Sequence, residues 1–221
     1  MRALLCGLVL LEVACGAPPP AVDAGVEPEP VVDAGPPRPD DPWADRVVRF
    51  VPGPGAGFGQ DLFPGVVLGP PSGGGDSAGS LDVLSLGNQG VIELEFLDLV
   101  AVDGPGVDLL VFENGFTGFF ETGAVAVSDD GVDWRTFPCG ADAGVSRCAG
   151  TRPVYANPAQ GISGTEPLVA GGDGFDLSDV GLARARFVRV TDSGANRFYG
   201  PPGGGFDLDA VSVVNTAPRS P

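Results

Sequence analysis

The sequence predicts an all-β protein that folds as a sandwich or a barrel. Short apolar runs rich in β-formers recur along the chain, clusters of Gly, Pro and Asp separate them, and no stretch has a convincing amphipathic helical pattern. The 36 Gly and 23 Pro residues among 221 could indicate disorder, but a hydrophobic content of 43% is enough for a real core. We therefore expect one turn-rich β domain, with disorder confined to the front of the chain.

The N-terminal segment is expected to be a secretory signal. Arg2 is followed by an apolar run over residues 3–11 and then by small residues around Cys15. The stretch EVAC resembles a bacterial lipobox, in which the signal is cut before a cysteine that is then lipidated, although Glu12 replaces the Leu-like residue of that motif. Lipidation of Cys15 is our preferred interpretation; the alternative is ordinary cleavage near Ala17, with Cys15 only a small residue of the signal.

The segment after the signal has the composition of a tether. Residues 16–42 repeat VDAG, are rich in proline and contain no aromatic residue, so they cannot bury enough apolar surface to fold. A semi-extended acidic tether would link a lipid anchor to a displayed domain. The predicted organisation is a signal at 1–15, a disordered linker at 16–42, a β domain at 43–216 and a tail at 217–221, in a protein that is anchored to the outer membrane or extracellular.

The domain divides into short candidate strands. In order, they are residues 46–51, 65–68, 81–86, 91–96, 107–112, 124–128, 132–137, 153–156, 184–191 and 210–214. In VIELEF, Ile92, Leu94 and Phe96 fall on one face of a strand. Glu93 and Glu95 fall on the other face, where we expect them to be half-solvated; a catalytic acid/base pair is the alternative.

Two short motifs in the domain predict a tight hairpin and a disulfide bond. SDDGVDW places Asp-Gly between two strand runs, which predicts a tight hairpin with Gly131 at positive φ. Cys139 and Cys148 are a close pair in an exported chain and predict a disulfide that closes a surface loop. A zinc or redox site is a weak alternative, because the chain has no His and the spacing is not CxxC.

The charged residues exclude several classes of function. All 12 basic residues are Arg, His is absent, and the net charge is −17, so binding to nucleic acid or to an anionic bilayer is electrostatically unfavourable. Without His or Lys the chain cannot form a Ser-His-Asp triad, a Cys-His dyad, a His-ligated metal site, a Schiff base or a P-loop. We therefore expect no enzyme activity, and cations rather than anions as small partners.

Carboxylates gather with glycines in three clusters. The clusters contain Asp103, Asp108, Glu113 and Asn114; Asp173, Asp176 and Asp179; and Asp207 and Asp209. Each cluster lies where a loop meets a strand, and Ca²⁺ prefers such an all-oxygen environment. The spacing is not that of an EF-hand loop, so separate loops would have to assemble the site. The alternative is that each Asp caps its own turn.

Aromatic residues in glycine-rich loops predict a ligand-binding face. They are Phe116, Phe119 and Phe120 in GFTGFF, and Phe198 and Tyr199 in NRFYGPPGGGF. Sugar sites use exposed aromatics that stack on pyranose faces, and Arg197 could bind a carboxylate or stack on a ring. The alternatives are aromatics in the core at strand ends and a solvated arginine.

Several phrases resemble, as an ordered set, a group of secreted bacterial cell-surface domains. The phrases are GSLDVLSLGNQGVIELEF, VDGPGVDLLVFENGF, VAVSDDGVDWRTFPC, ARFVRVTDSG and GFDLDAVSVVN, and the pattern is LGxGGxIxLxF, DGPGxDxxVFEN and VSxDGxxW. The resemblance covers about residues 50–215 and implies a jelly-roll β-sandwich like the galactose-binding and discoidin-type domains. It also implies calcium ligands at Asp103, Asp108, Glu113, Asp207 and Asp209. The chain departs from the pattern at Gln89, where the group has Gly, and at Leu109, where it has an aromatic.

Three functions follow as hypotheses. The first is a non-enzymatic cell-surface binding or adhesion module for a glycan or another extracellular ligand, stiffened by Ca²⁺, which would meet the membrane only through its lipid anchor. The second is a purely structural surface lipoprotein. The third is a glycoside hydrolase that uses paired carboxylates.

Overall fold

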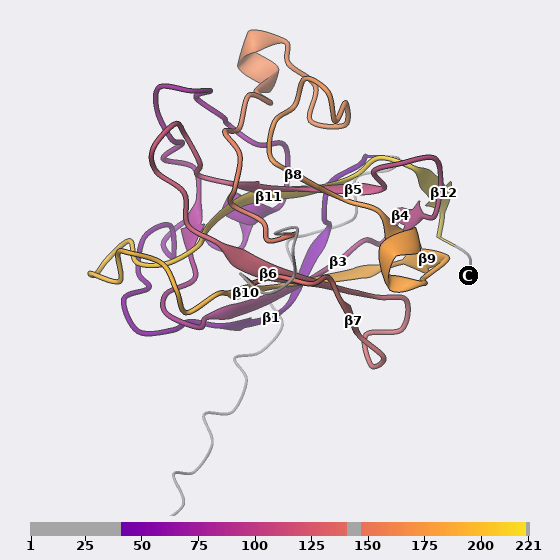
Figure 1. The fold of residues 1–221 in the computed structure, drawn as a ribbon, viewed down its shortest axis with the longest axis horizontal. Coiled ribbons are helices and arrows are strands. Elements are labelled where there is room, and N and C mark those ends of the chain that lie inside the picture. Colours follow the sequence, from indigo (N-terminus) through magenta and orange to yellow (C-terminus); the bar gives the residue numbers. More distant parts are fainter. Residues whose placement is uncertain (1–40, 141–146, 220–221) are drawn as a thin grey trace, which may run out of the picture.

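The computed structural model describes residues 41–140 and 147–219. The predicted signal, the lipidation site Cys15 and most of the linker lie outside the described residues. The described chain forms antiparallel strands joined by long loops (Figure 1). Its 3-10 turns include η1 (Gly65–Val67), η3 (Pro158–Gln160) and η4 (Leu177–Val180). Over residues 41–140 and 147–219, no helix has the length and apolar character needed to cross a bilayer.

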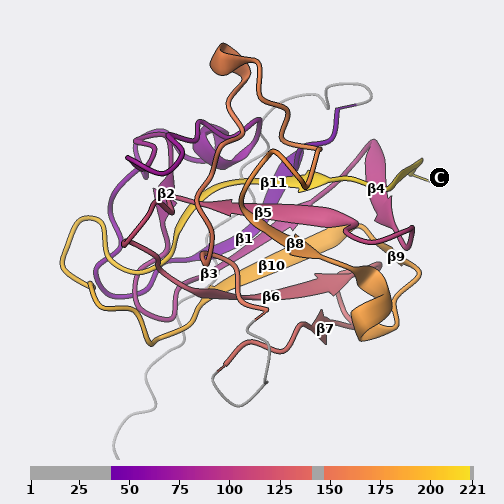
Figure 2. The same ribbon diagram turned by 45° about the horizontal axis from the view of Figure 1, so that its top comes forward.

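The strands form three antiparallel sheets. The largest has the order β1 (Arg46–Val51), β3 (Val91–Glu95), β10 (Phe187–Asp192), β6 (Gly123–Ser128) and β7 (Arg135–Thr136). The second has the order β2 (Leu84–Ser85), β11 (Asp207–Val213), β5 (Leu109–Glu113) and β8 (Asp173–Phe175). The smallest has the order β12 (Thr216–Pro218), β4 (Leu99–Val102) and β9 (Arg184–Ala185). The two larger sheets form facing layers, and the small sheet lies at one end of them (Figures 1 and 2).

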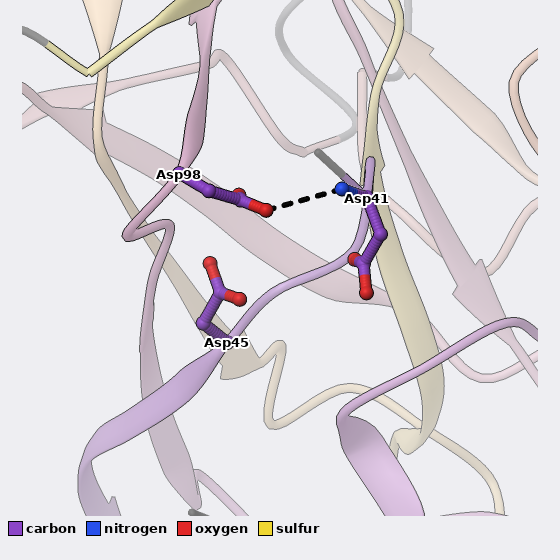
Figure 3. Close-up of side chains that lie close together, drawn as sticks. All are labelled: Asp41, Asp45 and Asp98. Atoms are coloured by element: carbon purple, nitrogen blue, oxygen red, sulfur yellow. Dashed lines mark hydrogen bonds between the residues drawn. The ribbon is translucent and has the colours of Figure 1, made fainter. Parts of the chain in front are cut away.

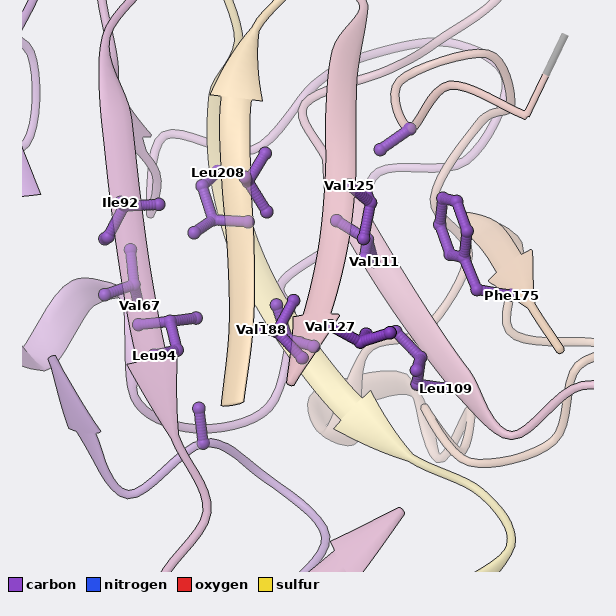
Figure 4. Close-up of a cluster of buried hydrophobic side chains, with 14 of the residues drawn as sticks. Val67, Ile92, Leu94, Leu109, Val111, Val125, Val127, Phe175, Val188 and Leu208 are labelled. Atoms are coloured by element: carbon purple, nitrogen blue, oxygen red, sulfur yellow. The ribbon is translucent and has the colours of Figure 1, made fainter. Parts of the chain in front are cut away.

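The main core lies between the two larger sheets. Side chains of β3, β6 and β10 meet side chains of β5, β8 and β11, and most of them are fully buried (Figure 4). In β3, Ile92 and Leu94 supply the alternating apolar face that the sequence predicts, and in β5, Leu109 and Val111 contribute to the same core from the other layer. The predicted all-β sandwich is therefore confirmed.

Strand β5 is buried on both faces. Leu109 and Val111 belong to the main core, whereas Leu110 and Phe112 pack in a second cluster with Val154 and other residues of the long connection before β8. All five residues of the strand are buried. A central strand covered on both sides reads as a continuous apolar run, as LLVF does.

Some strand assignments made from the sequence are wrong. Of residues 65–68, the first three form the 3-10 turn η1 and Leu68 caps it, because an apolar run this short, set between Pro64 and Gly69, fits a turn as well as a strand. Residues 153–156 contribute only an isolated bridge between Val154 and Gly171. The short strands β4, β8 and β12 were not expected. Strand β12 ends at Pro218, two residues beyond the predicted end of the domain at 216.

The outer face of the largest sheet also differs from expectation. Glu93 and Glu95 are 8% and 1% exposed rather than half-solvated. Arginines from β1 and β10 and from segments flanking the strands cover them: Arg49 and Arg189 pair with Glu93, and Arg46, Arg186 and Arg219 pair with Glu95. The two glutamates thus anchor a layer of arginine guanidinium groups over this face of the sheet.

The predicted hairpin and disulfide are both present. β6 pairs with β7 through Ala126 and Thr136, and Gly131 in the turn has φ 78°. Cys139 and Cys148 form a disulfide with a Cα–Cα distance of 4.7 Å.

Candidate functional site

The loop between β5 and β6, residues 114–122, presents a row of stacked aromatic rings. Phe116 and Phe119 form a backbone bridge, and their ring centroids lie 5.4 Å apart with nearly parallel planes. Phe119 also stacks on Phe198, which comes from the loop after β10, with centroids 5.7 Å apart. We call residues 114–122 the aromatic loop.

These rings border a cleft of about 250 Å³. Its lining residues are Gly118, Phe119, Phe120, Arg197 and Phe198. Phe120 is 41% exposed and Phe198 is 56% exposed, so apolar ring surface faces solvent here. Arg197 forms no hydrogen bond or ion pair with the described residues, which leaves its guanidinium available to a ligand. Two loops far apart in the sequence thus bring together most of the predicted binding residues.

Tyr199 does not line this cleft. Its hydroxyl accepts a hydrogen bond from the Asn196 N–H at 2.9 Å and donates one to Asp192 Oδ1 at 3.0 Å. Asp192 is 2% exposed and also accepts bonds from backbone N–H groups that include those of Gly194 and Phe206. Tyr199 therefore fixes the loop that carries Arg197 and Phe198.

The predicted metal ligands do not form one site, because strand β5 separates them. Asp108 precedes the strand and Glu113 ends it, and five residues of extended chain span about 16 Å. Strand β5 begins at the end of the sandwich near β4 and finishes at the opposite end (Figure 2). Asp103 directly follows β4 and Asp108 directly precedes β5, whereas Glu113 is the last residue of β5 and leads into the aromatic loop. The five predicted calcium ligands are therefore divided between separate places in the fold, and calcium binding stays a prediction.

At the first end, Asp103, Asp108 and Asp176 bring carboxylate oxygens within 4.8 Å of one another. Asp108 is fully buried, and its oxygens accept bonds from Gly104 N–H at 2.9 Å, Leu177 N–H at 2.8 Å and Asn215 Nδ2 at 2.7 Å. Asp176 caps η4 by accepting from the Ser178 N–H. Asp176 thus caps its own turn, as the turn-capping alternative predicts, whereas two of the three partners of Asp108 are distant in the sequence.

At the second end, Glu113 and Asp207 lie near a third acid, Glu121, which was not among the residues predicted from the sequence. Glu113 ends β5, Asp207 begins β11, and Glu121 lies near the end of the aromatic loop. Their side chains are buried: Glu113 and Glu121 are each 1% exposed, and Asp207 is 7% exposed. We call these three residues the buried triad.

Burial and mutual repulsion perturb the acidity of the triad. The pKa of Glu113 is raised well above its ordinary range, first by burial and then by the charges of Asp207 and Glu121. Burial and the charges of Asp207 and Asp192 raise the pKa of Glu121 to about 8. Burial raises the pKa of Asp207 to about 6, even though the side chains of Ser85 and Asn114 act in the opposite direction.

Asp209 stands apart from both groups. Leu208 lies opposite Glu113 and Ala210 lies opposite Phe112, so Asp209 is the extra residue at a shift of register in β11. It is 2% exposed and accepts from the Ser72 N–H, and burial raises its pKa to about 8. Asp209 is therefore not part of a shared metal site with Asp207.

The remaining acids of the predicted clusters are dispersed. Asp173 holds the Thr151 N–H and hydroxyl, and Asp179 pairs with Arg147. A further acidic group that the sequence analysis missed joins Asp41, Asp45 and Asp98 at the start of the domain, where the Asp41 N–H donates to Asp98 (Figure 3). Asp41 and Asp45 are close in the sequence, whereas Asp98 joins them only through the fold.

No protein-family model and no curated protein matches the chain. Inference about function therefore depends on the cleft and the buried carboxylates themselves.

Proposed function

We propose that the protein is a non-enzymatic cell-surface binding module that holds a carbohydrate in the aromatic cleft. The observation that carries the proposal is the exposed ring surface of Phe120 and Phe198 beside an unpaired Arg197. Pyranose rings present C–H groups that pack on aromatic faces, and an arginine can bind sugar hydroxyls or a sugar carboxylate through its planar fork. A cleft of about 250 Å³ accommodates one or two sugar units better than a larger ligand.

The same proposal includes export and anchoring. The N-terminal sequence and its lipobox-like EVAC support transport out of the cytoplasm and lipidation of Cys15, and residues 16–42 would serve as the tether. The resemblance to secreted bacterial surface domains is consistent with this placement. A calcium ion that stiffens the loops, as the sequence suggests, is also part of the proposal.

A glycan array on the purified full chain tests the binding function. The expected result is a restricted set of glycans whose binding falls about fivefold to tenfold in Phe198→Ala, because the ring supplies stacking worth about 1–1.4 kcal/mol. Leu168→Ala is the matched control, since Leu168 is 98% exposed and does not line the cleft.

Arg197→Ala separates acidic from neutral ligands. If the arginine binds a sugar carboxylate, this variant loses acidic glycans selectively, whereas Arg135→Ala, which alters an exposed arginine on β7, does not. An array without any bound glycan would contradict the proposal and favour the purely structural lipoprotein.

The hydrolase alternative has one observation in its favour, the raised pKa of Glu121, which suits a general acid. However, Glu121 is 1% exposed, and neither it nor Glu113 lines the aromatic cleft. Hydrolysis of an array-positive glycan that is lost in Glu113→Gln would support this alternative.

A further inference from the structure

We propose that Glu113, Glu121 and Asp207 bind one calcium ion at the base of the aromatic loop. Glu121 is the new member of this site, and Asn114 supplies a further oxygen. The site lies at the end of the sandwich opposite Asp103 and Asp108. It therefore differs from the site suggested by the sequence, which combined these two aspartates with Glu113 and Asp207.

The first support is a set of buried oxygens that lack a donor. Within residues 41–140 and 147–219, the following buried atoms have no hydrogen-bond partner: both carboxylate oxygens of Glu113, both of Glu121, Oδ1 of Asp207 and Oδ1 of Asn114. A buried carboxylate without a partner is very unfavourable, and buried charges in proteins are paired or coordinate a metal. Six unsatisfied oxygens match the number and chemistry of ligands that Ca²⁺ takes.

The second support is the contrast with other buried acids of the same chain. Asp108 holds three N–H donors, Asp192 holds backbone and side-chain donors, and Glu93 and Glu95 hold arginines. Where this fold uses a buried carboxylate structurally, it supplies the partners. In the triad, five of the six carboxylate oxygens have no hydrogen-bond partner, and no arginine among the described side chains forms an ion pair with it.

The third support is the local backbone. A Cβ at Gly115 would lie 2.9 Å from Glu113 Oε2, and a Cβ at Gly79 would lie 2.0 Å from Asn114 Oδ1. Both glycines thus let the main chain approach the unsatisfied oxygens more closely than any other residue could. Close backbone approach is typical of calcium loops, which add carbonyl oxygens to carboxylates.

The carboxylates of the triad are more widely spaced than those of the Asp103 group. Their oxygens do not all come within 4.8 Å of one another, whereas those of Asp103, Asp108 and Asp176 do. Rotation about the long side chains of Glu113 and Glu121 would bring the oxygens together around a cation. Because the donors are oxygens alone, Ca²⁺ fits better than Zn²⁺ or copper.

The position of the site gives the ion a role beyond local stability. Glu113 immediately precedes the aromatic loop and Glu121 lies near its end, so one ion would fasten both ends of the segment that carries Phe116, Phe119 and Phe120. Calcium would then pre-organise the aromatic cleft and raise its affinity for the ligand. This consequence, unlike the ion site itself, rests on the proposed function.

Isothermal titration of the metal-free full chain with CaCl₂ tests the site. The expected result is one site per chain, and Glu121→Gln should lower the affinity more than about 100-fold because it removes a charged ligand. The matched control is Asp103→Asn, which alters the other acidic group and should leave the titration unchanged. No heat with the wild-type chain, retained binding in Glu121→Gln, or loss of binding in Asp103→Asn would each overturn the proposal.

Thermal melts show whether Glu121→Gln loses calcium binding only because it fails to fold. In EDTA, Glu121→Gln should melt at or above the wild-type temperature, because it replaces a buried carboxyl group that has no hydrogen-bond partner. With Ca²⁺ at a hundredfold excess over Kd, the wild type should gain about 5–10 °C and the variant should not. An equal gain in both proteins would contradict the assignment.

Hydrogen exchange separates this inference from the glycan proposal. Ca²⁺ should slow exchange of the amides of residues 114–122 in the absence of any glycan, and Glu121→Gln should abolish the effect. If exchange slows but the array shows no ligand, the ion site stands and the carbohydrate function fails; if exchange does not change, the fastening role fails whatever the array shows.

Discussion

Asp108 accepts a 2.7 Å hydrogen bond from Asn215, 107 residues further along the chain. The same carboxylate holds the Gly104 N–H and the Leu177 N–H, so it ties the turn before β5, the start of η4 and the segment after β11 into one network. A residue that the sequence marks as a metal ligand is thus a structural node.

Replacement of this node should destabilise the fold. Asp108→Ala leaves three buried donors without a partner and should lower the free energy of unfolding by about 2–4 kcal/mol. Urea denaturation measures the change. Asp103→Ala, at an exposed position, should stay within about 0.5 kcal/mol; equal effects of the two substitutions would contradict the structural role.

The metal-free protein should lose stability as the pH rises. The pKa of Glu121 is raised from 4.5 to about 8 and that of Asp209 from 3.8 to about 8, so the folded protein keeps protons that the unfolded chain has released. The contribution is complete below the unfolded pKa values and is lost as the pH passes about 8. Urea midpoints in EDTA at pH 5 and pH 8 measure it, and stability that is constant or higher at pH 8 would argue against the raised values. Asp209→Asn should flatten the dependence.

The arginine layer on the outer face of the largest sheet should contribute measurably to stability. The Arg189 guanidinium lies 3.9 Å from the centre of the Trp134 ring and pairs with Glu93 at 2.9 Å. Arg189→Ala should cost about 1–2 kcal/mol, since it removes both contacts and leaves Glu93 with Arg49 alone. Arg135→Ala is the control, on the edge strand β7 of the same sheet. Arg189→Lys should recover only part of the loss, because an ammonium lacks the planar fork.

The disulfide should stabilise the end of the β6–β7 unit. Replacing Cys139 and Cys148 together by Ser should lower the free energy of unfolding by about 2–3 kcal/mol, since the bond closes a short ring. Calorimetry measures the shift in melting temperature. A reducing agent should reproduce the shift in the wild type and have no effect on the double variant; an unchanged melting temperature in the variant would remove the disulfide from the stabilising contacts.

Local patterns predicted the features that depend on neighbouring residues. The alternation in VIELEF gave β3 its buried Ile92 and Leu94, Asp-Gly marked the hairpin at Gly131, and the close cysteines marked the disulfide. Glycine-rich loops with aromatic residues marked the cleft. The strand, the hairpin and the disulfide need only residues that are close in the sequence, whereas the cleft also needs the fold to bring two distant loops together.

The sequence by itself therefore determined the all-β class, the hairpin, the disulfide and the supply of carboxylates and aromatics. Only the tertiary structure decided which carboxylates meet: it placed Asp108 and Glu113 at opposite ends of β5, gave Asp108 its donors and brought Glu121 beside Asp207. A strand keeps residues that are close in the sequence apart in space, and strand pairing brings distant ones together. Glu121 could not be recognised from FFETG, because burial without a partner is a property of the fold and not of the five residues around it.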